Sequence, residues 1–199
     1  MSHSAPAGEP VETRLVLARH GETAWSKSGQ HTGRTDIPLT ELGREQARRL
    51  GAELAGRTFG GVFASPLARA SETAHLAGFA SALVTDPDLQ EWDYGVYEGR
   101  RRIDIAVEEP GWTVWSRPIV GGESLVELGE RADRVIARLL PIGGDVLIFS
   151  HGHFLRVLAA RWIEAPPLTA SRLELSTATI SELGWEADRR VIEVWNRTP

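Results

Sequence analysis

The chain has 199 residues, which suits a single domain, and its 42% hydrophobic and 25% charged residues are ordinary for a globular protein. The net charge of −5 argues against a nucleic-acid-binding surface, and the absence of cysteine excludes disulfides, thiolate metal sites and a cysteine nucleophile. No membrane span or signal peptide is evident, so we expect a cytoplasmic protein with no membrane partner. Residues 1–12 are predicted to be a disordered lead-in to one domain over 13–199.

Three short apolar runs predict buried strands of a parallel sheet: Leu15–Ala18, Gly61–Ala64 and Asp145–Phe149. Ligands of such sheets bind outside the carboxyl ends of the strands. Each run is followed there by arginine or histidine, so we expect one cationic pocket. The residues predicted to converge in it are Arg19, His20, Arg69 and His151. Phosphate suits this pocket, and a neutral imidazole can attack phosphorus.

The first connection, Thr23–Pro38, is predicted to be a loop that forms a wall of the substrate site, or else a plain surface loop. A helix should then run from the N-cap Thr40 to about Gly56. A second helix should begin with Ser65 at the N-cap and Pro66 at the first helical position, and end near Ala77.

Arg69 falls in the first turn of that second helix, where a cation opposes the helix dipole. An anion bound at the helix start would compensate for this cost. The alternative is a surface arginine that pairs with Glu72 three residues later.

The segment Leu89–Gly99 mixes aromatic residues with carboxylates, a setting that favours a general acid. We expect Glu91 to be this acid, with Asp93 and Glu98 as less favoured choices that would otherwise cap helices or pair with arginines. Four tryptophans are candidates for an apolar wall of the site: Trp25, Trp92, Trp112 and Trp115.

The stretch Ile103–Pro118 shows no clear periodicity and is predicted to belong to a lid-like insertion at about 96–122. A helix should follow, from Ser124 to about Leu140, with Ser124 and Glu127 forming a capping box. Glu123 could approach the pocket or cap this helix.

Another helix should run from His151 to about Trp162. The pair His151 and His153 is a weak metal signal, because no third ligand has a convincing context. The last strands are predicted at about Arg172–Leu175, Thr177–Leu183 and Val191–Trp195, with an edge hairpin around Asp188.

Together these blocks resemble the histidine phosphatase superfamily, also called phosphoglycerate mutase-like. The matching residues are Arg19–Glu22, Ser65 and Pro66 with Arg69 and Thr73, and Ser150–His153. The resemblance extends from about Arg14 to Trp195. It implies an α/β fold, a three-layer α/β/α sandwich with a mostly parallel central sheet.

Within this family, the first loop is similar to that of fungal sedoheptulose bisphosphatases, and Tyr97-Glu98-Gly99 resembles the phosphatase branch. Mutases usually carry Asn after the tryptophan of the first loop, whereas Ser26 follows Trp25 here. The resemblance therefore implies a phosphatase rather than a mutase.

The resemblance also implies the roles of the site residues. His20 is the nucleophile that becomes phosphohistidine; Arg19, Arg69 and His151 form the phosphate pocket; and Glu91 is the proton donor. The expected substrate contacts are Arg19, Glu22, Thr23, Ser26, Thr32, Gly33, Arg69, Glu91, Tyr94, His151 and Gly152.

In the expected mechanism, a backbone carbonyl fixes one nitrogen of His20 and the other attacks phosphorus. Arg19 and Arg69 make bidentate bonds to the phosphate, and His151, protonated or donating, holds another oxygen. Glu91 protonates the leaving oxygen and then activates water. The cationic cluster makes a metal or other cofactor unnecessary.

The predicted function is a metal-independent phosphomonoesterase of the histidine acid phosphatase type, acting on small phosphorylated metabolites such as sugar phosphates. Two alternatives stay open: a cofactor-dependent phosphoglycerate mutase and a non-catalytic phosphoester-binding module. The expected partner is a small-molecule phosphate ester, and the resemblance allows a homodimer.

Overall fold

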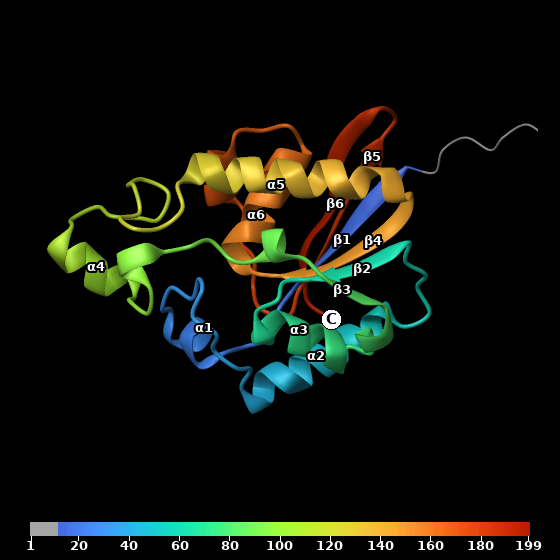
Figure 1. Ribbon diagram of the computed structural model, residues 1–199, viewed down its shortest axis with the longest axis horizontal. Helices are drawn as coiled ribbons and strands as arrows, with labels where there is room; N and C mark the ends of the chain where they lie inside the picture. Colours follow the sequence, from blue (N-terminus) through green and yellow to red (C-terminus); the bar gives the residue numbers. More distant parts are fainter. Residues whose placement is uncertain (1–11) are drawn as a thin grey trace, which may run out of the picture.

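The computed structural model describes residues 12–199 (Figure 1). The predicted lead-in over 1–12 therefore lies outside the described residues, apart from Glu12. The strands are β1 (Thr13–Arg19), β2 (Gly61–Ala64), β3 (Leu83–Thr85), β4 (Gly144–Ser150), β5 (Ile180–Glu186) and β6 (Arg189–Arg197). The α-helices are α1 (Ala24–Ser28), α2 (Glu41–Leu54), α3 (Ala68–Leu76), α4 (Arg102–Glu108), α5 (Leu125–Leu139) and α6 (Gly152–Trp162). Short 3₁₀ helices occur at Ala80–Ala82, Pro87–Leu89, Gly95–Tyr97, Leu140–Ile142 and Pro167–Arg172.

The six strands form one sheet in the order β3-β2-β4-β1-β5-β6. The first four strands of this order are parallel, and β5 and β6 are antiparallel additions at one edge. The register pairs Arg19 with Ser150 and Ala64 with Phe149, so β1, β2 and β4 end at the same edge of the sheet. The predicted mostly parallel sheet is confirmed, and the strand ends deliver their following residues to one place.

Helices cover both faces of this sheet, with α5 and α6 on one side and α2 and α3 on the other (Figure 1). This layering follows from the central strands, whose successive side chains point to opposite faces of the sheet. Leu15 and Leu17 of β1 belong to the core beneath α5 and α6, whereas Val16 and Ala18 belong to the core beneath α2 and α3. A strand buried on both faces needs apolar side chains at every position, and β1 has them. The three-layer α/β/α sandwich is thus confirmed.

Several local predictions are wrong. Ser65 does not cap α3, whose N-cap is Leu67; the Ser65 hydroxyl instead accepts the Leu67 N–H at 3.3 Å and contacts a histidine. The Arg172–Leu175 stretch forms no strand. The expected hairpin around Asp188 is confirmed by the antiparallel pairing of Glu186 with Arg189.

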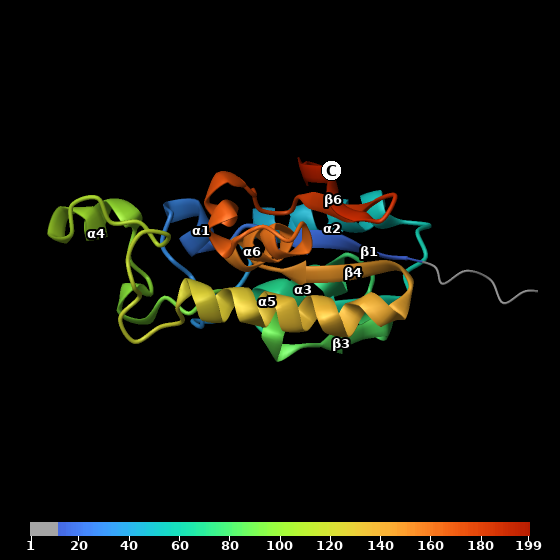
Figure 2. The same ribbon diagram turned by 90° about the horizontal axis from the view of Figure 1, so that it is seen from above.

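The first loop contains a short helix, α1, that the sequence analysis did not predict. Thr23 caps it, and Thr23 and Ser26 bond reciprocally in a capping box. The insertion also contains an unpredicted helix, α4, which lies beyond α1 and away from the sheet (Figure 2). Its aliphatic residues Ile103 and Val107 are exposed, so it lacks the buried stripe by which amphipathic helices are recognised.

Within residues 12–199, no helix is both long enough and apolar enough to traverse a lipid bilayer.

Candidate active site

His20 directly follows β1, and its main chain is fixed on both sides. Its N–H donates to the Ser150 carbonyl at 3.0 Å, and its carbonyl accepts the Ala178 N–H at 3.1 Å. The ring nitrogen Nδ1 lies 2.7 Å from the Gly21 carbonyl oxygen. A carbonyl can only accept, so Nδ1 carries the proton and Nε2 presents a lone pair. The expected backbone fixation of the imidazole is present in this geometry.

The surroundings of His20 keep its imidazole neutral. Burial lowers the pKa of His20 well below its ordinary value, and the nearby charges of Arg69 and Arg19 lower it further. Only 4% of the residue is exposed. A neutral imidazole with a free lone pair is the form that can act as a nucleophile.

Arg19 supplies one of the two arginine side chains that line the pocket, the other being Arg156. Its Nη1 donates to the Leu175 carbonyl, and its buried Nε has no hydrogen-bond partner. Gly152 lets this guanidinium lie against the start of α6, because a Cβ at that position would be 3.2 Å from the Arg19 Cζ. A buried N–H donor without a partner is rare and costly, and an anionic oxygen in the pocket would satisfy it.

Arg69 is fully buried, so the alternative of a surface arginine paired with Glu72 is wrong; Glu72 instead binds Arg44. Its Nη atoms donate to the carbonyls of the first loop at Thr32, Gly33 and Thr35, at 2.9–3.1 Å. Its Nε donates to His151 Nδ1 at 3.1 Å. In this structure Arg69 therefore contributes its charge to the pocket while holding the first loop.

His151 was expected to be protonated or donating, and its hydrogen bonds correspond to a neutral, donating ring. Because Nδ1 accepts from Arg69, Nε2 carries the proton and donates to the Ser65 hydroxyl at 2.8 Å. Burial lowers the pKa of His151 well below its usual value, with further contributions from Arg69, His20 and Arg19. His151 is thus a neutral donor, and its ring lies 5.2 Å from that of His20, centroid to centroid.

The carboxylate of Glu91 is held by three backbone N–H groups. Oε1 accepts from Trp92 at 2.9 Å and from Phe154 at 2.8 Å, and Oε2 accepts from His153 at 3.0 Å. Two of these donors belong to the first turn of α6, where the helix dipole favours an anion. Glu91 is therefore fixed at the pocket between its own segment and the helix that follows β4.

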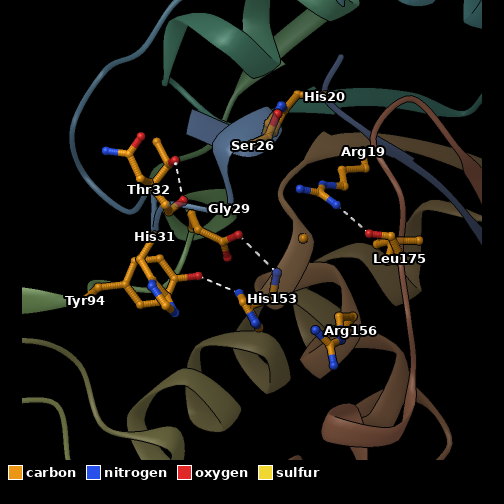
Figure 3. A pocket seen from close by; sticks show the side chains of 13 residues that line it. Arg19, His20, Ser26, Gly29, His31, Thr32, Tyr94, His153, Arg156 and Leu175 are labelled. Atoms are coloured by element: carbon orange, nitrogen blue, oxygen red, sulfur yellow. Dashed lines mark hydrogen bonds between the residues drawn. The ribbon is translucent and has the colours of Figure 1, made fainter. Parts of the chain in front are cut away.

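These residues face a cavity of about 190 Å³ (Figure 3). It is lined by Arg19, His20, Ser26, Gly29, Gln30, His31, Thr32, Glu91, Tyr94, Gly152, His153, Arg156 and Leu175. Of the predicted contacts, Arg69 and His151 lie beneath this lining and are fully buried. The structure thus places Arg19, His20 and Glu91 in the lining of one cavity, and Arg69 and His151 are bonded to each other behind it, with the His151 ring next to that of His20.

Three predicted substrate contacts point elsewhere. The Glu22 carboxylate accepts the Thr40 hydroxyl at 2.9 Å, the buried Thr23 caps α1, and the N–H of Gly33 donates to Glu98 at 2.7 Å. A Cβ on Gly33 would overlap the Trp92 carbonyl. These residues shape the first loop and do not line the cavity.

The sequence analysis missed the roles of three other lining residues: His31, His153 and Arg156. The tyrosine hydroxyl of Tyr94 lies 2.6 Å from His153 Nδ1, and Arg156 lies 4.8 Å above the Trp115 ring. His153 and Arg156 are three residues apart on α6 and so lie on the same face of the helix. Since Gly152, at the start of the same helix, was a predicted contact, this spacing could have identified both residues. The placement of His31 depends on an irregular loop, and no periodic signal points to it.

None of the four tryptophans considered as candidates for an apolar wall lines the cavity. Trp92 and Trp112 are buried in the core, and Trp115 packs against Trp92 with ring centroids 5.3 Å apart. Glu123 neither approaches the cavity nor caps α5; it pairs with Arg131. In residues 12–199, no cluster of three or more His, Cys, Asp or Glu side chains has the arrangement of a metal site.

Comparison with known proteins agrees with this geometry. The family model of the histidine phosphatase superfamily (branch 1) matches residues 15–198. The chain is 43% identical over 194 residues to an acid phosphatase of Mycobacterium tuberculosis, covering 93% of each chain. It is 35% identical over 182 residues to the sedoheptulose 1,7-bisphosphatase of Saccharomyces cerevisiae, covering 75% of this chain and 67% of that protein.

The same family includes proteins named as mutases. A probable phosphoglycerate mutase of Yersinia enterocolitica is 33% identical over 193 residues, with 92% of this chain and 89% of that protein covered. Among solved structures, an open reading frame product of Mycobacterium tuberculosis superposes with a TM-score of 0.87 at 40% identity, covering 94% of this chain and 98% of that one. The chain belongs to the histidine phosphatase superfamily, branch 1.

Proposed function

We propose that this protein is a metal-independent phosphomonoesterase that works through a phosphohistidine on His20. The observation that carries the proposal is the state of His20. It is a buried neutral imidazole whose Nε2 lone pair is free, next to an arginine with an unpartnered N–H. Phosphatase-named relatives at 43% and 35% identity support the same activity.

In the first step, Nε2 of His20 forms a bond to phosphorus while the bond from phosphorus to the ester oxygen breaks. Arg19 donates its free Nε–H to a phosphoryl oxygen, and the charge of Arg69 stabilises the equatorial oxygens from below. Glu91 in its acid form gives its proton to the leaving oxygen. The products of this step are the free alcohol and phosphohistidine.

In the second step, the Glu91 carboxylate takes a proton from water, whose oxygen bonds to phosphorus. The phosphorus–nitrogen bond breaks, inorganic phosphate leaves, and His20 is again neutral. The donors on both Glu91 oxygens hold the carboxylate at the same place in the two steps. One residue therefore serves as acid and then as base.

The outer half of the cavity favours a small, polar leaving group. Gln30, His31 and His153 offer hydrogen-bonding groups, and Arg156 places a second cation in the lining. Sugar phosphates carry the hydroxyl groups, and in some cases the second anionic group, that such a lining would bind. We therefore propose phosphorylated sugars or similar small polyols as the substrate class.

The test is phosphate release by purified protein, with EDTA present, from p-nitrophenyl phosphate, sugar mono- and bisphosphates and 3-phosphoglycerate. Release that persists in EDTA and disappears in His20→Ala is expected. Enzyme denatured during turnover in detergent at alkaline pH should carry phosphate on His20 that is stable to alkali and released by acid. A His20→Ala variant with near-native turnover would refute the mechanism.

The same panel separates the alternatives. Isomerisation of phosphoglycerate that requires a bisphosphorylated primer, without net phosphate release, would make the protein a mutase. Phosphate-ester binding with neither reaction would make it a binding module. Far-UV circular dichroism of His20→Ala confirms that loss of turnover is not loss of fold.

A further inference from the structure

The proposed acid Glu91 belongs to a segment with little regular structure. Between the end of β3 at Thr85 and the start of α4 at Arg102, the chain forms only two single-turn 3₁₀ helices. No strand ladder fixes these residues in the way that β1 fixes His20. The position of the Glu91 backbone therefore depends on side chains from other elements.

Arg131, on the buried face of α5, contacts this segment with its whole guanidinium group. Nη1 donates to the carbonyls of Asp88 at 2.7 Å and Gln90 at 2.6 Å, and Nη2 donates to the carbonyl of Glu91 itself at 3.3 Å. The remaining donors form a fork on Glu123, with Nε to Oε1 at 2.8 Å and Nη2 to Oε2 at 2.7 Å. All five N–H groups of the guanidinium are thus used.

The ion pair of Arg131 and Glu123 is shielded from water, and a contact with Phe154 also connects it to Glu91. The side chains of Arg131 and Glu123 are 5% and 13% exposed. The guanidinium also lies 4.7 Å from the ring centroid of Phe154, whose N–H donates to Glu91 Oε1. Glu123 holds the next residue along the segment as well, because its carbonyl accepts the Trp92 indole N–H at 2.7 Å.

We propose that Arg131 and Glu123 form a clamp that positions Glu91 for proton transfer. This proposal rests on the proposed function, in which Glu91 is the acid. Arg131 is a positioning residue, since it touches the main chain of the acid segment and does not line the cavity. A lysine cannot replace it, because one ammonium group cannot bind three carbonyls and both oxygens of a carboxylate.

The clamp can be distinguished from a merely stabilising ion pair by its dependence on the leaving group. Protonation matters most for a poor leaving group such as an alkyl alcohol, and little for p-nitrophenolate. A displaced acid should therefore slow one class of substrate selectively. Loss of stability alone would lower the amount of folded enzyme and slow both classes equally.

A matched control lies on the same helix. Asp133 of α5 binds Arg161 of α6 through two parallel bonds, at 2.9 Å and 3.0 Å, and contacts no residue of the acid segment through its side chain. Asp133→Asn weakens a bidentate ion pair between α5 and α6 but leaves the clamp intact.

The experiment measures kcat/KM, which covers the steps up to release of the alcohol, for glycerol phosphate and p-nitrophenyl phosphate. The enzymes compared are wild type, Arg131→Gln, Arg131→Lys, Glu123→Gln, Asp133→Asn and Glu91→Gln, with the folded fraction monitored by circular dichroism. We expect Arg131→Gln and Arg131→Lys to lose about tenfold or more with glycerol phosphate, and less than about threefold with p-nitrophenyl phosphate. Glu123→Gln keeps one acceptor oxygen, so it should show the same preference for losing activity with glycerol phosphate, but a smaller loss. This variant tests the clamp if the Arg131 variants fail to fold. Asp133→Asn should show no selectivity.

Equal losses on both substrates in the folded Arg131 and Glu123 variants would overturn the clamp. If Glu91→Gln is selective while these variants are not, the clamp alone fails and Glu91 remains the acid. If Glu91→Gln itself shows no selectivity, the role of Glu91 fails, and the clamp fails with it.

Discussion

The floor of the cavity and the wall beside it are held in place by different means. The floor consists of Arg19, His20, Arg69 and His151, and the wall consists of residues 29–32 and 91–94. Strand pairing fixes the main chain at Arg19 and His20, as in the bond from the His20 N–H to the Ser150 carbonyl at the end of β4. Helix starts hold the other two floor residues, Arg69 in the first turn of α3 and His151 at the N-cap of α6. The wall contains no strand of the sheet. Main-chain bonds hold His31 to Arg100 and Gly99, and side-chain hydrogen bonds from Arg69 and Arg131 to carbonyls hold the rest of the wall.

This difference separates phosphate handling from leaving-group handling. The floor carries the nucleophile and the cations, which every phosphate ester needs. The wall carries the acid and the polar groups that meet the rest of the substrate. Changes to the floor should therefore affect all substrates alike, and changes to the wall should depend on the substrate.

The largest effect is expected for Arg19→Ala on the floor. Among the described residues, Nε of Arg19 is the only buried arginine nitrogen without a hydrogen-bond partner, and its loss should lower kcat/KM about 10³-fold for every substrate. Steady-state kinetics with p-nitrophenyl phosphate and a sugar phosphate will measure it. Arg14→Ala, on the same strand but exposed and paired with Glu193, is the control and should retain activity. A substrate-selective loss in Arg19→Ala would contradict the division of roles.

On the wall, Glu91→Gln should lower kcat/KM, which covers the steps up to alcohol release, about 10²-fold for alkyl phosphates and much less for p-nitrophenyl phosphate. The matched control is Asp93→Asn, since Asp93 accepts the Gly95 N–H at 3.0 Å and does not line the cavity. Comparable losses on the two substrates would argue against Glu91 as the acid.

The buried floor also predicts how stability changes with pH. Burial lowers the pKa values of His20 and His151 in the folded state below the ordinary value of 6.5, so below that pH the unfolded chain binds more protons than the folded one. The free energy of unfolding should therefore fall as the pH is lowered from about 6.5 through the folded-state pKa values. Urea unfolding at pH 7.5, 6.5 and 5.5 measures this slope. His20→Gln should make it shallower, and an unchanged slope would contradict the assignment of a neutral buried imidazole.

The smallest effect is expected for Tyr94→Phe, which removes the hydroxyl next to His153 Nδ1 but keeps the ring. We expect a KM two- to fivefold higher for sugar phosphates, roughly the loss of one neutral hydrogen bond, with kcat for p-nitrophenyl phosphate unchanged. Tyr97→Phe is the control, because that hydroxyl binds Glu109 outside the cavity. If the two variants behave alike, Tyr94 does not contact the substrate.

The same contrast explains what could be predicted from the sequence. The apolar runs before Arg19 and His151 give the strands and their shared edge, so the floor follows from periodicity and from the general rule for parallel sheets. The choice of Glu91 rested on its aromatic neighbours, which separated it only weakly from Asp93 and Glu98, and on the resemblance, because no repeat relates it to the strands. The role of Arg131 was not predicted, since its partners are main-chain carbonyls of Asp88 and Gln90, which have no side-chain signature.

Local signals misled where tertiary contacts overrode them. Ser65 followed by proline is a strong helix start, but the hydroxyl binds His151 and the helix begins three residues later. In α4, Ile103 and Val107 are exposed, so the periodicity that reveals a buried helix face is missing. The tautomer of His151 follows from the hydrogen bond between Arg69 Nε and His151 Nδ1, at 3.1 Å. The sequence alone does not reveal this contact, because it forms only in the folded chain.

The strand order has a consequence for the synthesis of the protein. The strand that carries the nucleophile, β1, is made early, yet its neighbours in the sheet are β4 and β5, which begin at Gly144 and Ile180. At ribosomal rates the apolar residues of β1 wait roughly 10 s for the first of these partners. Until then the nascent chain holds an unpaired aggregation-prone strand and has no catalytic centre. Chaperone dependence should therefore be greatest during translation, and premature termination before β5 should yield products that are inactive and insoluble.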